Sequence, residues 1–400
     1  MNTTLRISEL LSAIDLELFL TQNKHLTAEK FILGSKDNTK ELNSLLAQQL
    51  VIYPKAYNKV PTFTRMHCWF TNKSYEQASS ETSALFKSTL FSGEKILDLS
   101  GGLGVDDWAF SQSFKEVISL DPDIFLNTLV RENFKKLGIS NIQRIDKTAE
   151  DYLVQTEEKF DLIFLDADRR NEKGKVFFLE QSQPNYLELE PICKKIAPQV
   201  LLKLSPMVDL VYLKNSLSDC AKIWILGDKT EVKEILVWID FTNKKPIETE
   251  VVILQDNGNL LSYTSKNEPV INQFKEGNYH YFFEPHACII KSNLYAEYAY
   301  SYELKLLATQ SMYFLGNKVP EMFMGRSFQL VQQMPYSKTT FKKYLQEEGI
   351  EKANISKRNF PLEVSEIRKT FKIAEGGEIY LFFSSNEKGE KYVFHCKKID

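Results

Sequence analysis

The feature that most constrains the fold is an apolar segment that ends in an acid and runs into a glycine-rich turn. Residues 95–99 (KILDL) have the pattern of a buried parallel strand, and residues 105–110 that of the helix that follows. The turn between them contains Gly101, Gly102 and Gly104. Glycines let the backbone approach a ligand closely. This order is typical of doubly wound sheets, which bind nucleotide-like ligands at the carboxyl ends of their strands.

The glycine pattern and the next strand indicate the class of ligand. A dinucleotide fingerprint, G-x-G-x-x-G, would need a third glycine at the position of Asp107. The strand expected over 116–120 is followed by Asp121, 23 positions after Asp98, where a carboxylate can hold a ribose diol through two hydrogen bonds. The pattern therefore favours S-adenosylmethionine over NAD.

Further patterns complete one sheet. An amphipathic helix over 124–137 ends at Gly138, a usual helix C-cap. The remaining expected strands are 141–145, 160–165, 199–204, 222–226 and 235–239. The last two resemble the antiparallel hairpin that ends the sheet of class I methyltransferases. We therefore expect an α/β fold with a Rossmann-like, mostly parallel sheet of seven strands.

Five segments, in order over nearly the whole chain, carry a resemblance to a known family. They are 77–81 (QASSE), 98–106 (DLSGGLGVD), 166–170 (DADRR), 203–209 (KLSPMVD) and 353–361 (ANISKRNFP). Residues from about 88 to 240 resemble a class I S-adenosylmethionine-dependent methyltransferase domain. Most of the chain resembles the bacterial methyltransferases that carry a THUMP-like domain at the C-terminus. That family usually has Asp-Pro-Ala-Arg-Arg at the third segment, where this chain has Ala167 and Asp168.

The resemblance implies a set of cofactor-binding residues. The helix expected over 74–87 would cover the methionine end of the cofactor, whereas its pattern alone would fit a solvated helix face. Thr148 stands where many relatives have the acid that reads the adenine amino group, so Glu150 becomes the candidate for that role. The expected contacts are Gln77, Glu81, Asp98, Ser100, Gly102, Gly104, Asp121, Glu150 and Asp166.

A methyl acceptor should lie beside the loop that follows the fourth strand. The expected catalytic residues are Asp166, Asp168, Arg169 and Lys203. The carboxylate of Asp166 could accept the hydrogens of an amine, although the prolines and the aromatic ring usual in amine-methylating enzymes are missing. Arg169 either clamps a phosphate or joins an ion network with the two acids. Residues 202–207 contain no nucleophilic cysteine, which excludes a carbon-methylating uracil enzyme.

The C-terminal part of the chain mixes basic and aromatic residues. This mixture suits RNA, through phosphate neutralisation and base stacking. Interspersed glutamates mean that an ordinary solvated surface explains it nearly as well. The resemblance to THUMP domains, which deliver tRNA to modification enzymes, favours RNA. The expected RNA-binding residues are Lys342, Lys343, Lys357 and Arg358.

Composition sets limits on location and partners. The net charge of −3 gives no support for a globally basic nucleic-acid binder. Five scattered cysteines without C-x-x-C spacing favour reduced thiols over a structural zinc site. No apolar run reaches the ~20 residues that span a bilayer, and residues 1–20 lack the pattern of a secretory signal, so we expect a cytoplasmic protein without metal or membrane partners.

Four domains are expected. They are an N-terminal helical domain with the cofactor-covering helix over 1–87, the methyltransferase domain over 88–242, a small ferredoxin-like domain over 243–285, and a helical connection with the THUMP-like domain over 286–400. The resulting hypothesis is an S-adenosylmethionine-dependent methyltransferase of tRNA or rRNA. Two alternatives stay open: an RNA-binding protein whose methyltransferase fold has decayed, and a methyltransferase of a protein or small molecule.

Overall fold

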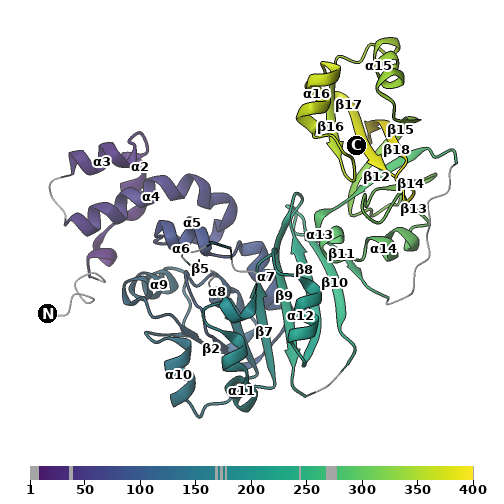
Figure 1. Ribbon diagram of the computed structural model, residues 1–400. Coiled ribbons are helices and arrows are strands. Elements are labelled where there is room, and N and C mark those ends of the chain that lie inside the picture. Colours follow the sequence, from purple (N-terminus) through teal and green to yellow (C-terminus); the bar gives the residue numbers. More distant parts are fainter. Residues whose placement is uncertain are drawn as a thin grey trace. The chain divides into compact units, whose positions relative to one another are not determined.

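The computed structural model describes residues 9–35, 39–166, 170–171, 174–175, 178–242, 245–266 and 277–399. The chain divides into two compact units (Figure 1). Unit 1 consists of Met1–Ile223 and Ile235–Ile247, and unit 2 of Trp224–Glu234 and Glu248–Asp400. The finer division into four domains stays a prediction.

A large sheet with parallel strands at its centre organises unit 1. The strand order is β11-β10-β8-β9-β7-β4-β1-β2-β3. Strands β3, β2, β1, β4 and β7 run parallel, and β9 is antiparallel to β7. Their bounds are β1 (Gly93–Asp98), β2 (Phe114–Leu120), β3 (Ile142–Ile145), β4 (Leu162–Asp166), β7 (Gln199–Leu204), β8 (Cys220–Gly227) and β9 (Val232–Asp240). This confirms the predicted Rossmann-like fold.

The described sheet has nine strands, whereas the sequence predicted seven. The two additional strands are β10 (Glu248–Leu254) and β11 (Leu260–Thr264), which form an antiparallel hairpin. Strand β10 neighbours β8 in the sheet. Residues 224–227 of β8 belong to unit 2, as does the hairpin. Nε1 of Trp224 on β8 donates to the carboxylate of Glu250 on β10 at 3.0 Å. An exposed strand edge offers unpaired backbone groups. Pairing with β10 satisfies the backbone groups at the edge of β8. The hairpin therefore extends the sheet, whereas the sequence predicted its residues to lie in a separate ferredoxin-like domain.

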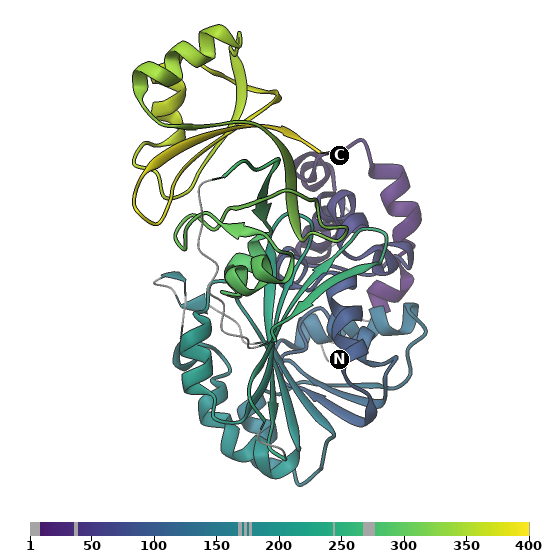
Figure 2. The same ribbon diagram turned by 90° about the vertical axis from the view of Figure 1, so that its right-hand side faces the viewer.

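Helices cover both faces of the parallel strands, as in other doubly wound sheets. Figure 2 views this sheet close to edge-on and shows helices on either side of it. They are α8 (Val105–Phe110), α9 (Ile124–Lys136), α10 (Ala149–Gln155), α11 (Tyr186–Ile196) and α12 (Leu210–Ser216), with the short 3₁₀ helix η1 (Leu179–Gln181). The predicted cap at Gly138 is present, with a left-handed φ of 70°.

The N-terminal part is helical, as predicted, but two of its details differ. Its helices are α2 (Leu16–Asn23), α3 (Ala28–Gly34), α4 (Lys40–Lys59), α5 (Pro61–Arg65), α6 (Asn72–Gln77) and α7 (Glu81–Leu90). The two prolines at 54 and 61 predict a break over 53–61, and the break lies only at the end of that range: α4 continues through Pro54 to Lys59, and α5 begins at Pro61. Ile52 and Ala56 on α4 are buried, so packing outweighs the hydrogen bond that a proline removes.

The helix expected over 74–87 is divided into α6 and α7. The side chain of Ser80 accepts a hydrogen bond from the backbone N–H of Ser83 and so starts a new helix. Ala78, the residue directly after α6, has extended backbone angles. The predicted single face is therefore wrong, because a serine cap interrupts it.

Unit 2 contains a second sheet with the order β13-β14-β12-β15-β18-β17-β16. Residues 325–398 form, in order, a strand, a helix, a strand, a helix and an antiparallel hairpin. These elements are β15 (Gly325–Pro335), α15 (Lys338–Glu347), β16 (Lys352–Lys357), α16 (Val364–Phe371), β17 (Ala374–Ser385) and β18 (Lys391–Lys398). The others are β12 (Tyr281–Pro285), α13 (Ala287–Lys291), α14 (Tyr295–Ser301), β13 (Lys305–Leu306) and β14 (Phe314–Gly316).

The five cysteines are buried as free thiols. Within the described ranges, no helix combines the length and apolarity needed to cross a membrane.

Candidate active site

The glycine-rich turn after β1 is held from one side by Arg144 of β3. The Nη2 of this buried guanidinium donates to the carbonyl of Gly102 at 2.6 Å, and its Nη1 donates to Asp107 Oδ2 at 3.0 Å and to Ser119 Oγ at 2.9 Å. A Cβ on Gly101 would lie 2.0 Å from Nη1. Glycine is therefore required at position 101 because the arginine fills the space of a side chain.

The other side of the turn is open at Gly102. This residue has φ of 49°, and a Cβ there would meet nothing closer than the carbonyl oxygen of Ser100 at 3.7 Å. Gly104 has φ of 81° and packs against the ring of Phe134. The turn thus presents Gly102 toward open space at the carboxyl end of β1, where a ligand can reach its backbone.

Asp121 lies beside this open side. Its Oδ2 accepts the backbone N–H of Gly102 at 3.2 Å, and its Oδ1 accepts the N–H of Asp123 at 2.8 Å. Arg144 Nη2 approaches Oδ2 at 3.6 Å. Each oxygen keeps acceptor capacity beyond these contacts, so the carboxylate is both oriented by the turn and able to accept two hydroxyl groups.

Asp98 and Asp107 form a buried pair of acids behind the turn. The side chain of Asp98 accepts from the N–H and the hydroxyl of Ser100, at 2.7 and 3.0 Å. Burial, followed by the neighbouring Asp107 carboxylate, raises the pKa of Asp98 well above its usual value. Asp107 Oδ1 is buried, and among the described groups no donor reaches it if Asp98 is ionised and can only accept hydrogen bonds. A proton on Asp98 supplies that missing donor.

Ser100 connects the glycine turn to the next strand. Besides its bond to Asp98, its hydroxyl oxygen accepts the backbone N–H of Asp166 at 2.7 Å. Asp166 ends β4, which neighbours β1 in the sheet. The predicted cofactor turn and the predicted acceptor acid are therefore one hydrogen-bonded assembly.

Asp166 belongs to a network of buried charges. Its Oδ2 bonds to the ammonium group of Lys203, its partner on β7. Burial raises the pKa of Asp166, while Lys203 acts in the opposite direction. A raised pKa brings a carboxylate closer to the range in which it can take up a proton near neutrality.

A second pair, Lys87 with Asp106, adjoins the first. Lys87 Nζ lies 2.9 Å from Asp106 Oδ1, and Ser79 Oγ donates to Asp106 Oδ2 at 2.7 Å. Burial alone would raise the pKa of Asp106, but the Lys87 and Lys203 ammonium groups outweigh it and lower the pKa. This carboxylate is therefore held ionised between two lysines, which links the segment before α7 to the acceptor side.

Several predicted residues have other partners or lie apart. Glu81 accepts the N–H groups of Thr62 and Phe63 at 2.6 and 3.2 Å, so it caps α5. Gln77 ends α6, and Glu150 is exposed in the first turn of α10. Contacts from these three side chains to a cofactor stay predictions.

The altered third segment is only partly visible. Asp168 and Arg169, with Ala167, lie outside the described residues. Arg170 is described by its backbone alone, in the short strand β5 (Arg170–Asn171), which pairs with β6 (Gly174–Lys175). The choice between a phosphate clamp and an ion network therefore stays open.

The four predicted RNA-binding residues fall into two kinds of environment. Lys342 and Lys343 are exposed on α15, where they line a shallow hollow with Lys338, Thr339 and Gln346. Lys357 bonds to Glu363 at 2.6 Å, and Arg358 bonds to Glu284 at 3.1 Å. The Arg358 guanidinium also lies 4.6 Å from the ring centre of Tyr313. Lys343 also forms an exposed ion pair with Glu347 on the same helix, at 3.5 Å. Lys342 and Lys343 are thus exposed on the surface, whereas Lys357 and Arg358 are half-buried.

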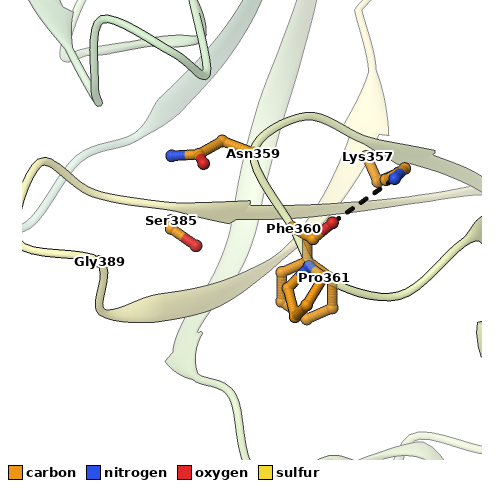
Figure 3. A pocket seen from close by; sticks show the side chains of 6 residues that line it. All are labelled: Lys357, Asn359, Phe360, Pro361, Ser385 and Gly389. Carbon is orange, nitrogen blue, oxygen red and sulfur yellow. Dashed lines mark hydrogen bonds between the residues drawn. The ribbon is translucent and has the colours of Figure 1, made fainter.

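A second hollow lies at the end of β16. It is lined by Lys357, Asn359, Phe360, Pro361, Ser385 and Gly389 (Figure 3). Asn359 has a left-handed φ of 51° and an exposed side chain, whereas Phe360 is buried. The 353–361 segment that carries part of the resemblance therefore shapes this surface.

Sequence reasoning missed Arg144 and gave no roles to Lys87, Asp106 or Asp107. A faint signal exists for each. Arg144 is a lone charge within the short strand 142–145, and Lys87 interrupts an apolar helical stripe. Their acidic partners, Asp107 for Arg144 and Asp106 for Lys87, become apparent only in the tertiary structure. Among the described residues, no cluster of three or more His, Cys, Asp or Glu side chains could hold a metal ion.

These observations fit a nucleoside-containing cofactor. The open Gly102 backbone allows close approach of a ligand, and the oriented Asp121 carboxylate offers acceptors for a diol. Gly102, Gly104 and Asp121 would line the ligand, with Asp166 nearby.

Comparisons with known proteins agree with this architecture. The model of a family described as THUMP domain-like matches residues 325–398. The crystal structure of a proposed methyltransferase from Porphyromonas gingivalis W83 aligns over 96% of this chain and 98% of its own, with 25% sequence identity and a TM-score of 0.84. No curated protein matches the chain in sequence.

Two other solved structures match more weakly. A proposed methyltransferase from Streptococcus mutans, in complex with SAH, is 14% identical over 40% of this chain and 96% of its own, with a TM-score of 0.31. An rRNA methylase from Streptococcus thermophilus is 15% identical over 40% of this chain and 93% of its own, with a TM-score of 0.30. Neither match is strong enough to carry an argument.

Replacing Gly101 by alanine tests the packing of the turn on Arg144. The added Cβ collides with a buried guanidinium, so we expect the free energy of unfolding to fall by about 1–3 kcal/mol. Gly34→Ala is the matched control, because nothing lies within 4 Å of its Cβ position. Chemical denaturation of both variants measures the difference. Equal stability of Gly101→Ala and wild type would contradict the packing.

Asp98→Asn tests the proton on the buried acid pair. Folding raises the pKa of Asp98, so its stabilising contribution is complete below the unfolded value of about 3.9 and is lost as pH rises toward the folded value. The stability of wild type relative to Asp98→Asn should therefore fall as pH increases above about 4.

Denaturation at a series of pH values measures this difference. Asp256→Asn, at an exposed acid of unit 2, is the control and should give a nearly constant difference. A stability difference for Asp98→Asn that rises with pH would contradict the assignment.

Proposed function

We propose that this protein, which combines a Rossmann-like methyltransferase fold with a C-terminal THUMP-like domain, is an S-adenosylmethionine-dependent methyltransferase that modifies a base of tRNA or rRNA. The observation that carries the proposal is the bond from the Asp166 N–H to Ser100, which joins the glycine turn to an acid at the end of the next strand. Cofactor site and acceptor site of such an enzyme must lie side by side, because methyl transfer is an in-line displacement.

The cofactor, when bound, supplies a methyl group activated by the sulfonium. The glycine turn positions it through the Gly102 backbone, and Asp121 accepts the ribose hydroxyls. Asp98 lies behind the turn, where burial raises its pKa, and it would face the ammonium group of the cofactor directly or through water.

Asp166 is the residue that faces the acceptor in this proposal. Its carboxylate accepts a hydrogen of an exocyclic or ring N–H and takes up the proton as the new N–CH₃ bond forms. Lys203 fixes the orientation of that carboxylate by binding Oδ2. The neighbouring Lys87–Asp106 pair keeps the local charge balanced.

The THUMP-like domain supports RNA as the substrate. Residues 325–398 match that family, and Lys338, Lys342 and Lys343 lie together on the exposed side of α15. Cations on a rigid helix neutralise phosphates without reading sequence. The base would then be chosen by unit 1, while unit 2 contributes affinity.

Transfer of a labelled methyl group to RNA tests the proposed activity. The RNA comes from a strain that lacks this gene, so that its target positions are unmethylated. Wild type should label it, and Asp166→Asn should lower kcat by roughly 10²- to 10⁴-fold, with cofactor affinity measured by calorimetry nearly unchanged. Asp256→Asn is the matched control and should retain full activity.

Each negative result of this experiment supports a different alternative. Cofactor binding without labelled RNA would point to a protein or small-molecule acceptor. Absence of both binding and label would favour an RNA-binding protein with a decayed methyltransferase fold. Full activity of Asp166→Asn would remove the proposed role of that carboxylate.

The double variant Lys342→Gln/Lys343→Gln tests the RNA contact. Loss of two phosphate contacts should weaken tRNA binding and reduce the slope of log Kd against log salt concentration by about two. Lys115→Gln, an exposed lysine on β2, serves as the control. Filter binding at several salt concentrations measures the slope. An unchanged slope would show that α15 does not contact phosphates.

A further inference from the structure

We propose that Phe178 is the surface on which the acceptor base stacks. The inference rests on the proposed function and adds to it a specificity residue for the acceptor. Phe178 has 51% of its surface exposed, which is unusual for a large aromatic side chain. The missing aromatic ring noted in the 166–170 segment would thus come from another element at the same edge of the sheet.

Phe178 is fixed although it is exposed. Its ring lies 5.2 Å from that of Tyr212 at an interplanar angle of 82°, an edge-to-face contact. The Tyr212 hydroxyl accepts the N–H of Leu179 at 3.1 Å and donates to Glu180 at 2.5 Å. Leu179 itself is buried. A single tyrosine therefore holds both the ring of Phe178 and the backbone directly after it, so the exposed face is pre-organised for a planar partner.

The topology brings this pair to the acceptor edge. Phe178 lies directly before η1, after β5 and β6 in the connection from β4 to α11, and Tyr212 lies in the first turn of α12, which follows β7. Strands β4 and β7 pair in parallel, with Asp166 opposite Lys203 at their carboxyl ends. Asp209 caps α12 by accepting the N–H of Tyr212 at 2.7 Å, which fixes where the helix begins. The aromatic pair thus comes from the two connections that leave the carboxyl ends of the strands carrying the charged pair.

Two more exposed apolar residues lie in the segment after β7. Met207 and Val211 have 52% and 59% of their surfaces exposed. Exposed apolar side chains beside a polar group are typical of recognition surfaces. A nucleobase matches this combination, because its flat face stacks on an aromatic ring while its polar edge meets a hydrogen-bonding group.

Substitution of Phe178 tests the stacking. Phe178→Ala should raise KM for the RNA acceptor by roughly tenfold or more, as expected for loss of one base–aromatic contact. Phe178→Leu, apolar but without a ring, should behave like alanine, and Phe178→Tyr should resemble wild type. Calorimetric affinity for S-adenosylmethionine should not change. Tyr57→Ala, at an exposed aromatic on α4, is the control.

An active wild type with unchanged KM in Phe178→Ala would overturn the inference and leave the proposed function intact. If wild type does not methylate RNA, the proposed function fails, and a second measurement still decides this inference. In Phe178→Trp, addition of unmethylated tRNA should quench the added indole fluorescence relative to wild type. Absence of added quenching would overturn the inference. Indole fluorescence that changes with protein concentration before tRNA is added would also overturn it, because that result would indicate a second copy of the chain on this surface.

Discussion

The site depends on one buried cation, the guanidinium of Arg144. Its nitrogens donate to the Gly102 carbonyl, to Asp107, to Ser119 and to Asn127, the last at 2.6 Å. A buried charge is tolerated only when such partners compensate its lost hydration. The turn and the arginine therefore depend on each other. The absence of a side chain at Gly101 leaves room for the guanidinium, and the guanidinium fixes the Gly102 carbonyl by a hydrogen bond. Lysine could not replace this fork of donors.

From this turn, the order of the site extends across three strands. The Ser100 hydroxyl donates to Asp98 of β1 and accepts the backbone N–H of Asp166 on β4, and the Asp166 carboxylate binds the ammonium group of Lys203 on β7. The carboxyl edge is thus a rigid row of polar contacts. A rigid row is what methyl transfer requires, since donor and acceptor must be aligned before reaction.

The sequence predicted the elements of the sheet well, because continuous apolar runs and glycine turns are local signals. Helix α8 begins at Val105, where the sequence predicted a helix to start. The division of 74–87 was missed although Ser80 is a usual N-cap residue. The place of β10 depends on a free strand edge, and the role of Arg144 depends on acids that are 37 and 23 positions away in the chain, Asp107 and Asp121. Such pairings have no signature in a single sequence.

The central claim is that a methyl-donor cofactor binds at the open side of the glycine turn. Calorimetric titration of S-adenosylmethionine into wild type and Asp121→Ala tests it most directly, because Asp121 accepts the N–H of Gly102 at the open side of the turn. We expect saturable binding by wild type and at least a tenfold weaker Kd in the variant, in the range of one lost charge-assisted hydrogen bond. Equal affinity of the two proteins, or no binding by either, would contradict the account.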